Sequence, residues 1–174
     1  MKTALDYLFR VESPWIYVGC GEPERKKWIP SYFYSHTGIN TCVRRLRGKK
    51  MRTKAALMDE FGASLQFFDG FGENWDALGE CLVCLDEWLL ANVYILVIES
   101  AEELLQDEHS DQMVALLKTL HDAGESWAKP ITDNGRFDRG AIPFHVLLNV
   151  SENEPSAVDE IARVAGEAKI PIRR

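Results

Sequence analysis

The strongest limit on how this chain can fold is a run of apolar, largely β-branched residues at 92–98. After Asn92 each side chain in the run is apolar, so a strand here has no face suited to water. Strands of this kind are typical of parallel sheets that are covered on both sides. We therefore expect a strand over residues 92–98, in a sheet with helices packed on it.

Helical and strand-like patterns alternate around this run. The predicted elements are, in order, a strand over 41–47, a helix capped by Thr53 and frayed at Gly62, a helix over 75–89, the strand over 92–98, a short helix opened by a capping box at 100–103, a helix over 110–123, a strand over 144–150 and a last helix over 155–165. This alternation favours an α/β fold with a small parallel sheet.

The length of 174 residues suits one domain with terminal extensions. The alternation occupies residues 40–150, which we predict to be the domain proper. Residues 1–39 hold a strand-like run at 15–18 and an aromatic stretch at 32–34, and we predict that they form an N-terminal extension. Residues 151–174 are predicted to be a C-terminal helical extension.

Composition excludes several classes of protein. With 46% hydrophobic and 27% charged residues, the chain is typical of a soluble globular protein and not of a disordered one. The apolar run at 93–98 is far shorter than the ~20 residues of a bilayer span, and residues 1–10 contain no secretory signal pattern. We expect a cytoplasmic protein with no membrane anchor.

The four cysteines and four histidines do not define a metal site by their spacing. Cys81 and Cys84 match a CxxC pattern, but no second such pair accompanies them and they lie within a helical apolar pattern. We expect them to be reduced packing residues, with redox or metal chemistry as the alternative. No metal and no cofactor are expected.

Charge is divided unevenly along the chain, which has a formal net charge of −7. Residues 1–54 carry 12 bases and 4 acids, residues 55–117 carry 14 acids and no Lys or Arg, and residues 118–174 carry 8 bases and 9 acids. The middle block cannot pair its own carboxylates. It is predicted to attract a positively charged partner, or else to pair with the basic block across the fold.

Part of this acidic block falls into a row on the predicted helix over 75–89. Glu73, Asp76, Glu80 and Glu87 are spaced by three, four and seven residues, which places all four on one side of a continuous helix. Asp76 and Glu80 are like charges four residues apart, a spacing that costs about 0.2–0.5 kcal/mol of helix stability. Because folding does not call for this row, it is a candidate binding surface, with a solvated helix face as the alternative.

The same region carries a motif. Residues 71–82 have the sequence Phe-Gly-Glu-Asn-Trp-Asp-Ala-Leu-Gly-Glu-Cys-Leu. This segment resembles the signature of the barstar family, intracellular inhibitors of the secreted ribonuclease barnase, whose stretch is Tyr-Gly-Glu-Asn-Leu-Asp-Ala-Leu-Trp-Asp-Cys-Leu. A weaker resemblance extends from about residue 40 to residue 150. It implies a three-stranded parallel sheet packed by helices, and inhibition of a basic active site by carboxylates.

The resemblance also implies which residues meet a partner. Asp76 and Glu80 match two acidic contact positions, with Glu80 as the central anchor. Asp122 aligns by its local sequence with a further acidic contact, and Trp75 replaces a contacting leucine. Glu73, in the same acidic row, completes the candidate set. Carboxylates suit this role because they can take the place of phosphate in charge-assisted hydrogen bonds with Arg and Lys.

Two positions depart from the family pattern. Gly79 stands where the family has a contacting tryptophan, and Gly70 aligns with a contacting tyrosine. Aromatic anchoring is therefore absent at these positions, and Phe71 or Trp75 is the alternative source of it. The departures make barnase itself a doubtful target.

The sequence favours a non-enzymatic inhibitor or immunity protein, monomeric when free, that blocks a basic ribonuclease-like protein such as a toxin. The alternative is a regulatory interaction module with the same fold and a partner that is not a nuclease. An enzyme using Glu73, Asp76 or Glu80 lacks a phosphate-binding glycine motif, a nucleophile and a nearby histidine. The basic stretch at 44–52 is expected to protect a strand edge and balance the acidic block, not to bind nucleic acid.

Overall fold

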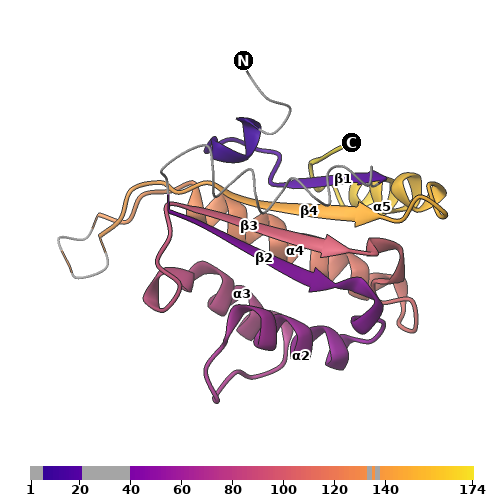
Figure 1. The fold of residues 1–174 in the computed structure, drawn as a ribbon, viewed down its shortest axis with the longest axis horizontal. Helices are drawn as coiled ribbons and strands as arrows, with labels where there is room; N and C mark the ends of the chain where they lie inside the picture. Colours follow the sequence, from indigo (N-terminus) through magenta and orange to yellow (C-terminus); the bar gives the residue numbers. More distant parts are fainter. Residues whose placement is uncertain (1–5, 21–39, 133–134, 136–137) are drawn as a thin grey trace.

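Five parallel strands form one sheet in the part of the chain that the computed structural model describes, residues 6–20, 40–132, 135 and 138–174 (Figure 1). Each neighbouring pair in the sheet is parallel. From one edge to the other, the strands are β2 (Thr41–Arg47), β3 (Val93–Glu99), β4 (Phe144–Val150), β1 (Ile16–Cys20) and β5 (Ile172–Arg173). The α/β class and the parallel sheet are confirmed.

The expected count of three strands is wrong, because β1 and β5 come from the two terminal extensions. β1 lies beside β4 and β5 lies beside β1, so the sheet does not follow the order of the chain. Pairing between segments so far apart leaves no local pattern, and the two residues of β5 are too few to show one. The boundaries at 39/40 and 150/151 stay a prediction, and the aromatic stretch at 32–34 lies outside the described residues.

The four described α-helices all pack on one face of the sheet (Figure 1). They are α2 (Lys54–Leu65), α3 (Trp75–Val83), α4 (Ser110–Trp127) and α5 (Ser156–Glu167). The predicted N-cap of α2 is confirmed, since the Thr53 hydroxyl accepts a hydrogen bond from the Ala56 N–H at 3.3 Å. Helix α2 continues past Gly62 to Leu65, so the expected fraying is wrong.

Short 3-10 turns join these elements: η1 (Asp6–Phe9), η2 (Gly48–Lys50), η3 (Leu85–Glu87) and η4 (Ala101–Glu103). The capping box predicted at 100–103 is wrong. Ser100 adopts a left-handed backbone conformation with φ of 53°, and its side chain caps no N–H. A capping serine needs an extended backbone to aim its hydroxyl at the first turn, which Ser100 does not have.

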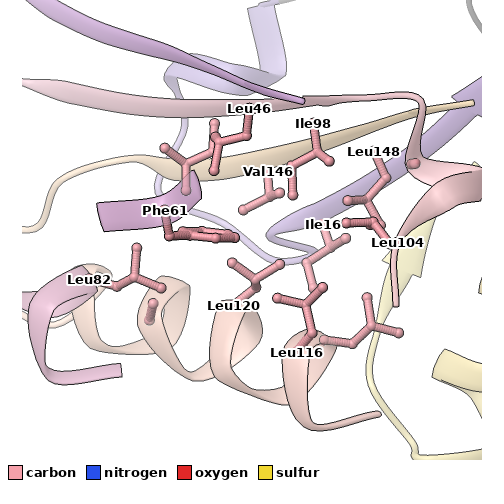
Figure 2. Close-up of a cluster of buried hydrophobic side chains, with 14 of the residues drawn as sticks. Ile16, Leu46, Phe61, Leu82, Ile98, Leu104, Leu116, Leu120, Val146 and Leu148 are labelled. Atoms are coloured by element: carbon pink, nitrogen blue, oxygen red, sulfur yellow. The ribbon is translucent and has the colours of Figure 1, made fainter. Parts of the chain in front are cut away.

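The main hydrophobic core lies between the helices and the sheet (Figure 2). Phe61, Leu82, Leu116 and Leu120 come from three helices and meet strand residues such as Val146. Leu78 and Leu82 of α3 are fully buried in it. This packing holds one side of α3 against the core and leaves the opposite side to solvent.

The other face of the sheet is covered differently from what the sequence predicts. Val93, Ile95 and Val97 point to this face and cluster with Leu8 of η1, which is fully buried. Strand β3 is covered on both sides, as its apolar run requires. Helices, however, cover only one face, and in the described part a turn of the N-terminal extension packs on the other.

Trp15 ties the N-terminal extension to the helix layer. Its side chain is 2% exposed, and its indole N–H donates a hydrogen bond to Glu125 of α4 at 2.7 Å. A Cβ atom at Gly124 would clash with the Trp15 ring, so the close approach of β1 to α4 requires glycine there. This part of the extension therefore belongs to the same core as the predicted domain.

Candidate functional site

Helix α3 begins with a sharp turn that exposes its first acidic residue. Asn74 is the N-cap, and its side-chain oxygen accepts a hydrogen bond from the Ala77 N–H at 2.9 Å. Glu73, just before it, has φ of 48° in the left-handed region and is exposed. The capped first turn places Asp76 on the solvent side of α3, near the positive end of the helix dipole.

The predicted row of four acidic residues on a single helix is wrong. Helix α3 ends at Val83, so only Asp76 and Glu80 lie on it, while Glu73 precedes it and Glu87 belongs to η3. Tertiary contacts end the helix early. Leu85 is fully buried, and the indole N–H of Trp88 donates to the Leu65 carbonyl at 2.8 Å, which draws the chain into a 3-10 turn.

A shallow groove of about 460 Å³ runs between α3 and α4. It is lined by Trp75, Asp76, Gly79, Glu80 and Val83 of α3 and by Thr119, Asp122 and Ala123 of α4. Five of the six candidate residues thus lie on one surface, although Asp122 is distant from the others in sequence. The sixth candidate, Glu73, is exposed but does not line the groove.

Sequence reasoning missed Val83, Thr119 and Ala123, which complete the groove. The signal that could have found Thr119 is its helical spacing, because it lies three residues before Asp122 and so shares its side of α4. Nothing local to the sequence indicates that this side of α4 faces α3.

The two carboxylates of α3 differ from Asp122 of α4 in having no ion pair within the described residues. Asp76 and Glu80 are both exposed, and in the described part of the chain neither forms a salt bridge. Asp122 pairs with Lys118, one turn earlier on α4, at 2.6 Å between exposed side chains. Exposed pairs of this kind hold their partners weakly and exchange them readily.

Elsewhere part of the acidic block pairs with the basic segment of the chain, as in the alternative prediction. Arg45 pairs with Glu99, and Arg47 with Glu60. Hydrogen bonds from Arg47 hold the pKa of the Glu60 carboxyl below its usual range. Arg52 binds both Glu103 and Asp107. Asp76 and Glu80 of α3, with the flanking Glu73 and Glu87, are among the carboxylates that form no ion pair in the described part of the chain.

Trp75 forms a wall of the groove. Its indole N–H donates to the Gln112 side chain at 3.0 Å, and the Lys54 ammonium lies 5.7 Å from the ring centroid. These contacts tether the ring to α2 and α4. The Trp75 ring therefore forms a fixed flat surface at the edge of the groove and is not free to insert into a pocket of a partner.

A second pocket, of about 860 Å³, lies on the other side of α3. Phe68, 61% exposed, and Phe71 line it together with Gly70, Cys81 and Cys84, and Glu80 borders it as well as the groove. Glu80 therefore stands between the two hollows, where a partner bound to either would meet its carboxylate.

Of the two cysteines of this pocket, Cys81 is buried and Cys84 is partly buried. Burial raises the pKa of both the Cys81 and Cys84 thiols, and nearby carboxylates raise it further. Raised thiol pKa values disfavour the thiolate, the reactive form. All four cysteines of the chain are free thiols, and in the described part no group of three or more His, Cys, Asp or Glu residues has the geometry to hold a metal ion.

The chemistry of the groove is that of cation binding. Its eight lining residues include three carboxylates and no histidine, cysteine or basic side chain. Such a set offers hydrogen-bond acceptors to an ammonium or guanidinium group. Fold and site together define an α/β protein that displays carboxylates on an exposed helix.

The chain belongs to the barstar family. A family model described as Barstar (barnase inhibitor) matches residues 41–149, which run from the first residue of β2 almost to the end of β4 and include the whole groove. A search of curated proteins finds no significant match. The match leaves out β1, α5 and β5. Among the described helices, none has the length and apolar character needed to cross a membrane.

Proposed function

We propose that this chain is an intracellular, cytoplasmic inhibitor or immunity protein that binds a basic ribonuclease-like protein with the α3 face and blocks its active site. The observation that carries the proposal is the pair of exposed α3 carboxylates, Asp76 and Glu80, which form no ion pair with any described residue, on a barstar-family fold. Inhibition is the activity that the family description names.

Physical chemistry connects this surface to a ribonuclease. An active site that holds phosphate presents Arg, Lys and His side chains, and a carboxylate can take the place of a phosphate oxygen. Glu80 is the central contact in this proposal because it borders both hollows of the face. Asp76 and Asp122 flank it across the groove, and the more peripheral Glu73 contributes to electrostatic steering.

A second candidate function is a regulatory interaction module with a partner that is not a nuclease. The glycines at 79 and 70 favour it, because they remove side chains from both hollows. In this function the chain is a monomer without a cofactor, and its α3 face binds a basic protein other than a ribonuclease.

An inhibition assay tests the proposal. The purified chain is titrated into barnase and into a set of other secreted basic ribonucleases, and cleavage of a fluorogenic RNA is followed. We expect stoichiometric inhibition of at least one enzyme, lost in the double variant Asp76→Ala/Glu80→Ala. The matched control is Glu160→Ala/Glu167→Ala on α5, which should inhibit like the wild type.

Failure to inhibit any of these enzymes, with circular dichroism showing a folded chain, would contradict the ribonuclease assignment and favour the second candidate. Equal inhibition by the wild type and by the double variant of α3 would show that another surface binds.

A further inference from the structure

Gly79 occupies the middle of α3, where glycine is an unfavourable choice. Glycine in a helix interior destabilises the helix relative to alanine, because it loses more backbone freedom on folding. A fold requires it only where a Cβ atom would clash or the backbone is left-handed. Gly48 and Gly124 meet the first condition, since a Cβ atom would overlap the backbone of 99–100 at Gly48 and the Trp15 ring at Gly124.

Neither condition holds at Gly79. A Cβ atom there would lie 3.8 Å from the Thr119 methyl group, an ordinary van der Waals distance, and the residue is helical. Gly62 and Gly166 also tolerate a Cβ atom, but neither of them lines the groove. Among these three helical glycines, only Gly79 lies on α3 with Asp76 and Glu80.

The absence of a side chain at 79 shapes the groove. Gly79 lies between Trp75 and Val83 on α3, and a side chain built on it would extend toward Thr119 of α4, across the groove. The hollow thus has a largely apolar lining, and the carboxylates of Asp76, Glu80 and Asp122 lie around it. Most side chains larger than alanine at 79 would fill it.

We propose that Gly79 is a specificity-determining residue, which keeps open a socket for an arginine side chain of a basic protein partner. The inference rests on the proposed function and adds what the partner must supply. The family signature has tryptophan at this position, so there the inhibitor helix supplies the large side chain. In this chain α3 supplies the cavity, and a side chain of the partner fills it.

Charge complementarity and shape both select arginine. Its aliphatic stem matches the apolar lining, and its planar guanidinium can bind carboxylates through two parallel hydrogen bonds. It can also lie against an aromatic face such as that of Trp75. Lysine offers a single compact charge without this planar geometry, so it should bind the socket more weakly.

The first test asks whether the fold needs Gly79. Gly79→Ala should raise the midpoint of thermal unfolding by about 2–4 °C, because alanine is the better helix former and meets no clash. Gly166→Ala on α5 is the matched control for an open helical glycine. A fall in the midpoint for Gly79→Ala would show that the glycine is structural and would overturn the inference.

The second test measures the socket itself. N-acetyl-L-argininamide is titrated into the ¹⁵N-labelled chain, and amide shifts are followed by NMR. We expect saturable shifts at Gly79, Val83 and Thr119, at least tenfold weaker affinity for the neutral citrulline analogue, and loss of the shifts in a folded Gly79→Leu variant. Equal shifts in Gly79→Leu, equal binding of the citrulline analogue, or no saturable shifts at these residues would overturn the inference.

The titration contains no ribonuclease, so its result is independent of the inhibition assay. If the wild type inhibits a ribonuclease but the Gly79→Leu variant binds the arginine probe as tightly as the wild type does, the proposed function stands and the socket is contradicted. A chain that binds the probe at Gly79 but inhibits no ribonuclease keeps the socket for a basic partner and loses the ribonuclease assignment.

Discussion

Helices α3 and α5 both carry acidic side chains on their solvent side, but only those of α5 form ion pairs in the described part of the chain. On α5, Arg163 pairs with Glu160 at 2.7 Å and with Glu167 at 2.5 Å, and Arg174 pairs with Asp159 at 2.8 Å. On α3, Asp76 and Glu80 have no such partner in the described part of the chain. The acidic side chains of α5 thus lie beside arginines of the same molecule, whereas those of α3 have no such cation in the described part.

The two helices also lie in regions that differ in whether a glycine can be replaced by a residue with a side chain. Near α5, β1 packs so closely on α4 that Gly124 admits no side chain, and Trp15 is almost fully buried. At α3, Gly79 admits a side chain without a clash. We infer that the end of the sheet formed by β1, α5 and β5 serves stability, and that the α3 face serves binding. Each prediction below tests one side of this division.

The largest expected effect is on stability. Trp15→Ala removes a buried aromatic ring and its hydrogen bond to Glu125, and should lower the free energy of unfolding by about 3–5 kcal/mol. Urea denaturation followed by circular dichroism measures this change. The inhibitory activity per folded molecule should not change, and a loss below about 1 kcal/mol would contradict the role given to β1.

The next largest effect is on binding. Glu80→Ala should weaken the complex with an inhibited ribonuclease by about 2–5 kcal/mol, because it leaves a buried cation of the partner unpaired. Asp76→Ala should follow as the second most damaging change. Calorimetric titration gives the affinities, and thermal unfolding should shift by only a few degrees, because both side chains are exposed and their interactions with the α3 dipole and with each other are small. Glu160→Ala on α5, the control, should leave the affinity as it is.

A smaller effect concerns acid stability at the β1 side of the sheet. His145 is fully buried, its Nε2–H donates to the Arg10 carbonyl at 2.9 Å, and its Nδ1 has no hydrogen-bond partner in the described part. Burial lowers the pKa of this imidazole below its usual value of about 6.5. The unfolded chain therefore binds a proton more readily than the folded chain, so stability falls as the pH drops below about 6.5.

Between pH 6.5 and 5.5 this residue should lower the free energy of unfolding by up to about 1 kcal/mol. Urea denaturation at the two pH values should show it in the wild type, and the difference should shrink in His145→Gln. The exposed His109 provides the control substitution, His109→Gln, which should retain the full difference. An unchanged pH dependence in His145→Gln would assign the acid sensitivity to other groups.

The smallest expected effect is at the margin of the α3 face. Glu87 lies in η3, exposed, and lines the second pocket but not the groove. Glu87→Ala should slow association with a basic partner and reduce its salt dependence, with little change in the dissociation rate. Stopped-flow association rates at two salt concentrations measure this. A large increase in the dissociation rate would instead place Glu87 at the centre of the contact.

Local sequence patterns predicted the central strands well. The predicted strands at 41–47 and 144–150 coincide with β2 and β4, and the third is shifted by one residue. Apolar runs between turn signals mark such strands because both of their faces are buried. The early end of α3 could not be predicted in this way, since contacts of Leu85 and Trp88 with distant residues cause it.

The residues of the candidate site could not all be predicted from helical spacing. Spacing alone placed Asp76 and Glu80 on one helix side, and only the family resemblance joined Asp122 to them. The structure then brings all three to one groove. The places of β1 and β5 in the sheet could not be predicted because they depend on pairing with distant segments. The lack of ion pairs on α3 among the described residues likewise depends on where the basic segment lies after folding.

A double-mutant cycle tests the central claim most directly. Glu80→Ala is combined with alanine substitution of an active-site arginine in a ribonuclease that the chain inhibits, and the four affinities are measured by calorimetry. Direct contact predicts a coupling energy above about 1.5 kcal/mol. The same cycle with Glu160→Ala should be additive within about 0.5 kcal/mol. Additivity at Glu80 with every active-site arginine, or equal coupling at Glu160, would contradict the assignment of binding to α3.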